Sequence, residues 1–224
     1  MLVHHGKMLE EKMKNGNRWY LKFFAVIILA IAVPIMFRGI SSAATAAADP
    51  VVFVKDAVDE IISILQDEKL AVPARRAERK KRVVTIVEKK FDFRDMSMRA
   101  LAKHWQERTP EEQDRFVLLF KTLLENTYIA KIETYSGEKV VFKKTAFQGN
   151  KAIVYSDLVR KNVETPVNYK LKNNDDRWMV YDVEVEGVSL VNNYRTQFAS
   201  ILSKENFAGL VAKLEEKGSK GAVE

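Results

Sequence analysis

The stretch "DVEVEGVSLVNNYRTQF", residues 182–198, joins two kinds of secondary structure. Its first part alternates apolar and acidic residues, which is the period of a half-buried strand. After Gly187, the residues Leu190, Tyr194 and Phe198 recur every four positions, which is the period of a helix. The stretch holds no nucleophile–base pair, no phosphate-binding loop and no metal-ligand spacing. It therefore predicts a strand that turns into a covering helix, with apolar and aromatic side chains at the joint.

Three further strands are predicted before this joint. The segments "KVVFKKTAF" (139–147), "AIVYSDLV" (152–159) and "TPVNYKL" (165–171) precede "RWMVYDVEV" (177–185), and short polar turns separate them. Short connections favour an antiparallel, meander-like arrangement. The sequence therefore predicts a twisted antiparallel sheet of about four strands.

Simple alternation assigns the two faces of the last of these strands. Tyr181 and Val183 fall on one face, which is apolar along its whole length. Val180 falls on the other face together with Asp182. We therefore expect the face that carries Tyr181 and Val183 to be the buried one.

Helices are predicted both before and after the sheet. Pro50 begins the first helix, and "TPEE" (109–112) is a capping box that begins a long helix reaching about residue 135. A helix over 188–204 and a last helix around Leu210 follow the sheet. Helices grouped at both ends of one antiparallel sheet define a single α+β domain, in which N- and C-terminal helices wrap the sheet.

The first 48 residues have the features of a secretory signal. Basic residues precede the apolar run "FFAVIILAIAVPIMF" (23–37), and the alanine-rich "SSAATAAADP" follows it. We predict a signal peptide over 1–48 with cleavage after Ala48, a mature domain over 49–216 and a flexible tail over 217–224. A retained membrane anchor is the alternative, although the apolar run is shorter than the roughly 20 residues that span a bilayer.

The charge of the predicted mature chain is modest. Residues 1–48 hold six Lys/Arg and two acids, a net +4 that leaves +3 of the total +7 for the remainder. A mildly basic domain argues against a duplex-DNA binder, and we expect no nucleic-acid partner. The chain has no cysteine, so an exported domain must rely on its hydrophobic core rather than on disulfides.

The helix predicted over 73–90 carries the largest cluster of charge. We call six of its residues the basic cluster: Arg75, Arg76, Arg79, Lys80, Lys81 and Arg82. Lys89 and Lys90 follow near its end. A solvated helix face is one interpretation, and a docking surface for anionic headgroups or an acidic partner is the other.

Residues suited to catalysis are sparse. His104 is the one histidine of the predicted mature chain, which also lacks cysteine, so no zinc site of the usual composition is expected. Asp182 is a candidate general base of an isomerase or hydrolase, or else a structural carboxylate paired with Arg195. Asp92 and Arg94 would make a similar structural pair. We expect no catalytic residue, no metal and no cofactor.

Five stretches carry a resemblance to a known family. In chain order they are "FDFRDMSMRALAKHW", "TPEEQDRFVLLFKTLLENTYIAKIETYSGEKV", "TPVNYKL", "RWMVYDVEVEGVSLVNNYRTQF" and "LVAKL". Together, after a signal segment, they resemble the MlaC family, the periplasmic phospholipid-binding proteins of the maintenance-of-lipid-asymmetry system, also called toluene-tolerance auxiliary proteins. The resemblance covers 49–216 and departs from the family pattern at "MSMRAL", where smaller residues are expected.

The resemblance implies a carrier that holds phospholipid acyl chains in an apolar cavity. It implies a monomer in the periplasm that exchanges lipid with an inner-membrane MCE-type ABC transporter complex and an outer-membrane lipoprotein complex. Composition alone fits a filled core equally well. Another lipid, such as a hopanoid, remains open as cargo, and so does the enzyme reading of Asp182. The candidate tail contacts are Phe120, Leu123, Tyr128, Val167, Tyr169, Met179, Tyr181, Val183, Val188, Leu190, Tyr194 and Phe198.

Overall fold

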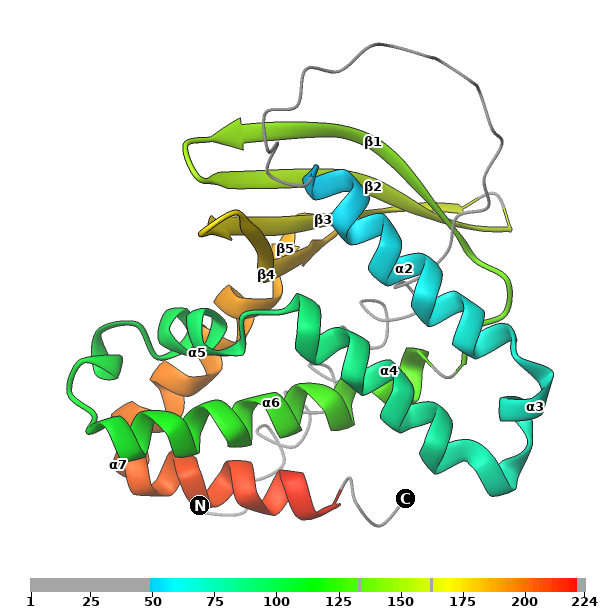
Figure 1. Cartoon of the computed structure of the whole chain (residues 1–224). Coiled ribbons are helices and arrows are strands. Elements are labelled where there is room, and N and C mark those ends of the chain that lie inside the picture. The colour runs from blue at the N-terminus through cyan, green and yellow to red at the C-terminus, as the bar shows by residue number, and fades with distance from the viewer. Residues whose placement is uncertain (1–48, 133, 162, 221–224) are drawn as a thin grey trace, which may run out of the picture.

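The structure is a computed structural model that describes residues 49–132, 134–161 and 163–220 (Figure 1). The predicted signal segment, residues 1–48, lies outside them. Helices and strands follow one another as α2 (Pro50–Gln66), α3 (Glu68–Ala71), η1 (Pro73–Arg75), α4 (Arg76–Lys90), α5 (Phe93–Leu101), η2 (Ala102–Trp105), α6 (Pro110–Ile132), β1 (Lys139–Gln148), β2 (Lys151–Arg160), β3 (Val163–Asn174), β4 (Arg177–Val185), β5 (Val188–Ser189) and α7 (Leu190–Lys220). None of these helices combines the length and apolar character needed to cross a membrane.

The predicted helix starts are confirmed by their capping bonds. Asp49 caps α2, because its carboxylate accepts a hydrogen bond from the Val51 backbone N–H at 2.8 Å. At the start of α6, the Thr109 N–H donates to the Glu112 carboxylate at 3.0 Å and the Glu112 N–H donates to the Thr109 hydroxyl at 3.3 Å. This is the reciprocal capping box that the sequence predicts. The helix ends at Ile132, slightly earlier than expected.

The sheet is antiparallel and contains five strands in the order β1-β2-β3-β4-β5. The four predicted strands are present, and the fifth is the two-residue β5. Glu186 and Gly187 have positive φ values of 49° and 79°, which form a tight two-residue turn so that Val185 pairs with Val188. The chain therefore makes a short hairpin at the joint before α7 begins at Leu190.

A β-bulge in β4 changes which residues share a face. Lys170 of β3 pairs with Asp182, whereas the next residue of β3 pairs with Val180, so Tyr181 has no partner across the ladder. The extra residue interrupts the alternation. Val180 and Val183 are consequently both buried on the helix-covered side. The expectation that Tyr181 and Val183 share the buried face is wrong for this reason.

Two hydrophobic clusters organise the domain. The first joins the sheet to α2, α4 and the end of α6, and the second joins α5, α6 and α7. Figure 1 shows the sheet in the upper part of the view, with α6 and α7 layered below it. These observations confirm an α+β domain in which helices wrap an antiparallel sheet.

The two predicted C-terminal helices are the halves of one kinked helix, α7. Asn206 has a non-helical backbone with φ 56° between the halves. Its side-chain oxygen accepts a hydrogen bond from the Gly209 N–H at 3.2 Å, which starts the second half. The helix continues to Lys220, so it extends into the segment 217–224 predicted as a tail.

Candidate functional site

An apolar cavity of about 110 Å³ lies where the two hydrophobic clusters meet. Its wall is formed by one side of α2, the junction between α4 and α5, the second half of α6, strands β3 to β5 and the first turn of α7. Among the described residues, only Lys90, Glu125, Ser189 and Asn193 bring charged or amide or hydroxyl side chains to this wall, besides the phenols of Tyr128 and Tyr169. The site is therefore shaped to hold apolar groups rather than to position reacting ones.

Asp182 fixes the joint that forms one end of the cavity. Its side chain is buried and accepts hydrogen bonds from the Ser189 hydroxyl at 2.7 Å and from the Val191 N–H at 3.1 Å. The Ser189 hydroxyl in turn accepts a hydrogen bond from the Asn192 N–H at 3.0 Å, so Ser189 is the N-cap of α7. A carboxylate at a helix N-terminus is also favoured by the helix dipole.

A lysine completes this arrangement from the neighbouring strand. The Lys170 ammonium lies 3.2 Å from Asp182 and 3.0 Å from Glu184. Partial burial lowers the pKa of Lys170, but the hydrogen bonds and charges of these two carboxylates outweigh burial and raise the pKa above its ordinary value. The expected Asp182–Arg195 pair is not formed, because the Arg195 guanidinium donates instead to the Arg99 carbonyl at 2.9 Å. Asp182 has the partners of a structural carboxylate and does not line the cavity.

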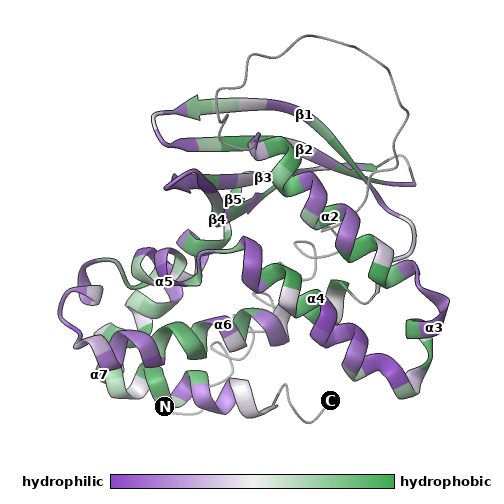
Figure 2. Ribbon diagram, viewed as in Figure 1, coloured by the Kyte–Doolittle hydropathy of each residue, from purple (hydrophilic) through white to green (hydrophobic). Residues whose placement is uncertain are grey.

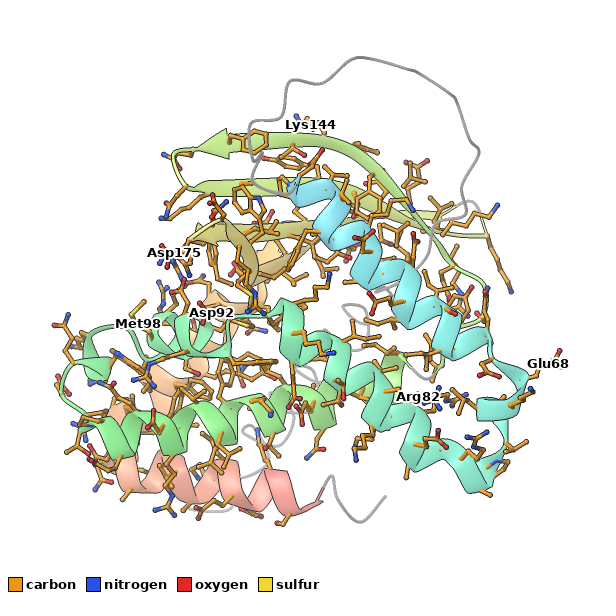
Figure 3. The ribbon with its side chains drawn as sticks, in the orientation of Figure 1. Glu68, Arg82, Asp92, Met98, Lys144 and Asp175 are labelled. Atoms are coloured by element: carbon orange, nitrogen blue, oxygen red, sulfur yellow. The ribbon has the colours of Figure 1, made fainter. Side chains whose placement is uncertain are left out.

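His104, the other residue considered for catalysis, and the expected Asp92–Arg94 pair also have structural partners elsewhere. His104 contacts Glu107 at 3.0 Å on the short η2 helix, away from the cavity. Arg94 pairs with Asp114 at 2.5 Å rather than with Asp92. Asp92, labelled in Figure 3 at the start of α5, accepts a hydrogen bond from the Asp95 N–H at 2.8 Å. In the described ranges, no group of three His, Asp or Glu side chains is placed to hold a metal ion.

Five of the twelve predicted tail contacts lie on the cavity wall. They come from α6, β3, β4, β5 and α7: Tyr128, Tyr169, Val183, Val188 and Leu190. Tyr169 is buried, and this burial raises the pKa of its hydroxyl. The strand and the helix on either side of Gly187 therefore meet at one cavity.

The other seven lie elsewhere. Phe120, Tyr194 and Phe198 pack ring against ring in the second cluster, with centroids 5.1 to 5.5 Å apart. Leu123 belongs to the same cluster. Their placement differs from the prediction because the same helices also face one another. Leu123, Tyr194 and Phe198 border a separate pocket of about 230 Å³ between α6 and the two halves of α7.

Strand residues account for the remaining differences. Val167 is buried in the first cluster without lining the cavity. Met179 and Tyr181 lie on the opposite face of β4 because of the bulge, and the Tyr181 ring is covered by the Arg99 guanidinium at 4.1 Å.

Several wall residues were not predicted. Helix α2 contributes five of the fourteen, the largest share of any element, and its apolar stripe is visible in the sequence but fits a core equally well. The unpredicted apolar wall residues are Phe53, Val54, Ala57, Val58, Ile61, Val87, Phe91, Phe93, Met96, Leu124, Ile129, Ile132, Val180 and Val185. Phe91 is held in place by the backbone, because it forms a parallel bridge with Val180 of β4.

Glu125 is the acidic residue of the wall. One of its carboxylate oxygens is buried without a hydrogen bond, and the nearest cation is the Lys121 ammonium at 3.8 Å. Burial raises the pKa of Glu125, because the charged form is poorly solvated beside an apolar cavity. The carboxylate is therefore a destabilising feature of the wall at neutral pH.

The basic cluster lies on the first half of α4 and the η1 turn before it, at a distance from the cavity wall. Figure 2 shows this part of α4 as hydrophilic, and Arg82 is labelled on it in Figure 3. Glu78 partly neutralises the cluster, since it pairs with Arg75 at 2.8 Å and with Arg82 at 2.5 Å. These two bonds lower the pKa of Glu78. The cluster keeps a net positive charge on an exposed helix face.

The fold and the cavity together define a class of protein: a small α+β domain built around an apolar chamber. The chain belongs to the MlaC protein family, whose model matches residues 55–216. The structure of a phospholipid-binding protein from Ralstonia solanacearum, solved in complex with a phospholipid, is similar with a TM-score of 0.69 and 26% sequence identity. The similarity covers 78% of this chain and 99% of that one.

Two curated relatives have names of the same kind. The intermembrane phospholipid transport system binding protein MlaC of Haemophilus influenzae is 21% identical over 131 residues, which is 56% of this chain and 61% of the relative. The toluene tolerance protein ttg2D of Pseudomonas putida is 29% identical over 125 residues, which is 51% of this chain and 58% of the relative. The matched region thus spans about three fifths of either relative's length.

Proposed function

We propose that this protein is a periplasmic lipid carrier that holds phospholipid acyl chains in the apolar cavity. The observation that carries the proposal is the cavity itself, whose wall is almost entirely apolar. The similarity to a structure solved with a bound phospholipid supports a phospholipid as cargo. The structural bonding of Asp182 removes the main support for an isomerase or hydrolase.

The energetics explain why such a carrier is needed. Each methylene removed from water is worth ~0.8 kcal/mol, so a lipid with about thirty tail methylenes faces roughly 24 kcal/mol on entering water unprotected. An apolar wall recovers most of this free energy without strong polar bonds. Because few directional contacts must break, release to a partner stays possible.

The cavity has to widen to hold a whole diacyl lipid. A group the size of a water molecule occupies about 10–15 Å³ of cavity volume, so a cavity of 110 Å³ accommodates about nine such groups. This is fewer than the methylenes of two long acyl chains. The lipid-loaded protein should therefore have a larger cavity, with the tails lying between α2 and the sheet.

The transport route is the further part of the proposal. A cleavable signal peptide over 1–48 would deliver a soluble monomer to the periplasm. There it would exchange lipid with an inner-membrane MCE-type ABC transporter complex and an outer-membrane lipoprotein complex. The exposed basic cluster on α4 is the proposed docking face for these partners or for anionic headgroups.

The test is lipid content in a matched pair of charge variants. Leu190→Asp places a carboxylate on the cavity wall, whereas Asn192→Asp places the same charge in the same first turn of α7 at an exposed position. Both carboxylates lie at a helix N-terminus, where they are tolerated. We expect the wild type and Asn192→Asp to purify with phospholipid detected by mass spectrometry, and folded Leu190→Asp to purify largely without it.

Two results would contradict the proposal. The wild type could purify without any lipid and fail to take one up from vesicles. Alternatively, folded Leu190→Asp, verified by circular dichroism, could keep the full lipid load of Asn192→Asp. The second result would move the tails away from this wall, and the first would remove the carrier function altogether.

A further inference from the structure

Lys90 is the only positively charged side chain on the described wall of the cavity. It is the last residue of α4 and is half-buried, as expected of a lysine whose methylene stem lies along an apolar wall while its ammonium stays in contact with water. The stem and the charge thus bridge the apolar interior and the solvent. This is the position that the junction between an acyl chain and a charged headgroup would occupy.

The present contacts of the Lys90 ammonium are weak ones. It donates a long hydrogen bond to the Phe53 carbonyl at 3.4 Å and lies 4.3 Å from the centroid of the Phe53 ring. No carboxylate in the described part of the chain forms an ion pair with it. A lysine has three donors, so at least one remains for an incoming acceptor.

The other polar groups of the wall are less suited to an anion. The Ser189 hydroxyl is committed to Asp182 and to the N–H of Asn192. The Asn193 side-chain oxygen accepts a hydrogen bond from Gln197 at 3.3 Å, which leaves its NH2 group as a donor. This donor is neutral, so its hydrogen bond to an anion is weaker than that of an ammonium. Glu125 would repel an anion when ionised. The charges on this wall therefore favour an anion beside Lys90 and nowhere else on the described wall.

We propose that Lys90 binds the phosphate of the lipid headgroup at the rim of the cavity. This inference rests on the proposed function and adds a headgroup contact to it. The phosphodiester would replace the Phe53 carbonyl as the main partner of the ammonium, with the acyl chains directed into the cavity. Lysine acts as a single point charge rather than a two-pronged clamp, so the contact selects phosphate without holding it too tightly for transfer.

The test compares two lipids that share their acyl chains and glycerol backbone, of which only one carries a phosphate-containing headgroup. Delipidated protein is offered an equimolar mixture of phosphatidylglycerol and diacylglycerol with identical acyl chains, and native mass spectrometry gives the ratio bound. Lys90→Met removes the charge but keeps a straight apolar stem, and Lys90→Arg keeps the charge. Lys89→Met is the matched control, because Lys89 is the exposed neighbour outside the cavity wall.

We expect Lys90→Met to lower the ratio of phosphatidylglycerol to diacylglycerol about tenfold relative to the wild type, the usual effect of one charged hydrogen bond. Lys90→Arg should recover most of the wild-type ratio, and Lys89→Met should leave it unchanged. Comparing ratios between variants cancels the different intrinsic affinities of the two lipids.

Other outcomes overturn the inference, each in its own way. An unchanged ratio in Lys90→Met would remove the phosphate contact while leaving the carrier function intact. A fall of the same size in Lys89→Met would mean that positive charge at this end of α4, rather than a contact of Lys90 with the headgroup, sets the preference. If the wild type binds neither lipid, the proposed function fails and this inference fails with it.

Discussion

Replacing Ala57 by leucine should partly fill the cavity and reduce lipid binding without harming the fold. Ala57 is half-buried on α2 and lines the cavity, so three added carbons project into space that is empty in the ligand-free protein. Alanine and leucine have similar helix propensities. The change therefore tests the cavity rather than the helix that carries it.

The expected gain in stability follows from the cavity volume. At about 24 cal/mol per Å³, an empty cavity of 110 Å³ costs the ligand-free protein about 2.6 kcal/mol. Three buried carbons at ~0.8 kcal/mol each contribute about 2.4 kcal/mol, and ordering the side chain costs about 0.5–1 kcal/mol. The delipidated Ala57→Leu variant should thus be about 1.5–2 kcal/mol more stable than the delipidated wild type.

The assay measures the two effects separately. Urea unfolding of delipidated protein gives the free energy of unfolding, and the midpoint of thermal unfolding should rise by about 3–8 °C. Because the leucine already fills part of the space that an acyl chain would occupy, the affinity of Ala57→Leu for lipid should fall about tenfold. Ala77→Leu is the control, since Ala77 is exposed on α4 and should leave both quantities unchanged.

One combined result would refute this reasoning. If Ala57→Leu lowers the stability of the delipidated protein and binds lipid like the wild type, the added carbons have overpacked a filled region and the tails lie elsewhere. A variant that is stabilised and also binds lipid fully would show that the ligand enters through a different part of the wall.

Three further predictions use groups around the cavity and on α4. Because the pKa of Glu125 is raised in the folded protein, ionisation of this carboxyl opposes folding, and Glu125→Gln should raise the midpoint of thermal unfolding at pH 7. The gain should fade as the pH falls to about 4, where the carboxyl is protonated in both the folded and the unfolded state. A gain that does not depend on pH would contradict this prediction. Asp182→Ala leaves the Ser189 and α7 donors without their acceptor and should cost about 3 kcal/mol by urea unfolding; a loss of function at full stability would instead revive a catalytic role. Replacing Lys80, Lys81 and Arg82 by glutamate should weaken binding to partner membrane complexes while lipid content stays at the wild-type level, and the loss of binding should be largest at low salt. Unchanged pull-down of those complexes would make the basic cluster an ordinary solvated helix face.

Local signals were read correctly from the sequence because the interactions behind them are local. The capping box of Thr109 and Glu112 spans a single helical turn, so its residue types already specify both hydrogen bonds. The turn at Gly187 is equally local, since a positive φ is easily reached by glycine. The strands and their antiparallel order followed from alternation and short turns in the same way.

The side-chain assignments on the strands could not be read in this manner. The bulge at Tyr181 depends on how β4 aligns with β3, and a shift of one residue moves every later side chain to the other face. Nothing in the alternation of "RWMVYDVEV" signals that shift. Val180 was therefore placed on the wrong face, and Tyr181 was assigned to the cavity that it does not reach.

The sequence by itself determined the main helices, the four longer strands, the α+β class and the joint at which β4 leads into α7. It did so because hydrophobic period, capping and turn chemistry are properties of neighbouring residues. Tertiary structure alone decided which apolar side chains fill a core and which border the cavity. Phe120 and Phe198 satisfy the same helical period as Leu190, yet the rings pack between α6 and α7 whereas Leu190 faces the cavity. Removal from water stabilises an apolar side chain equally in a filled core and beside a cavity. Only the three-dimensional placement of the helices therefore decides which of the two positions a side chain takes.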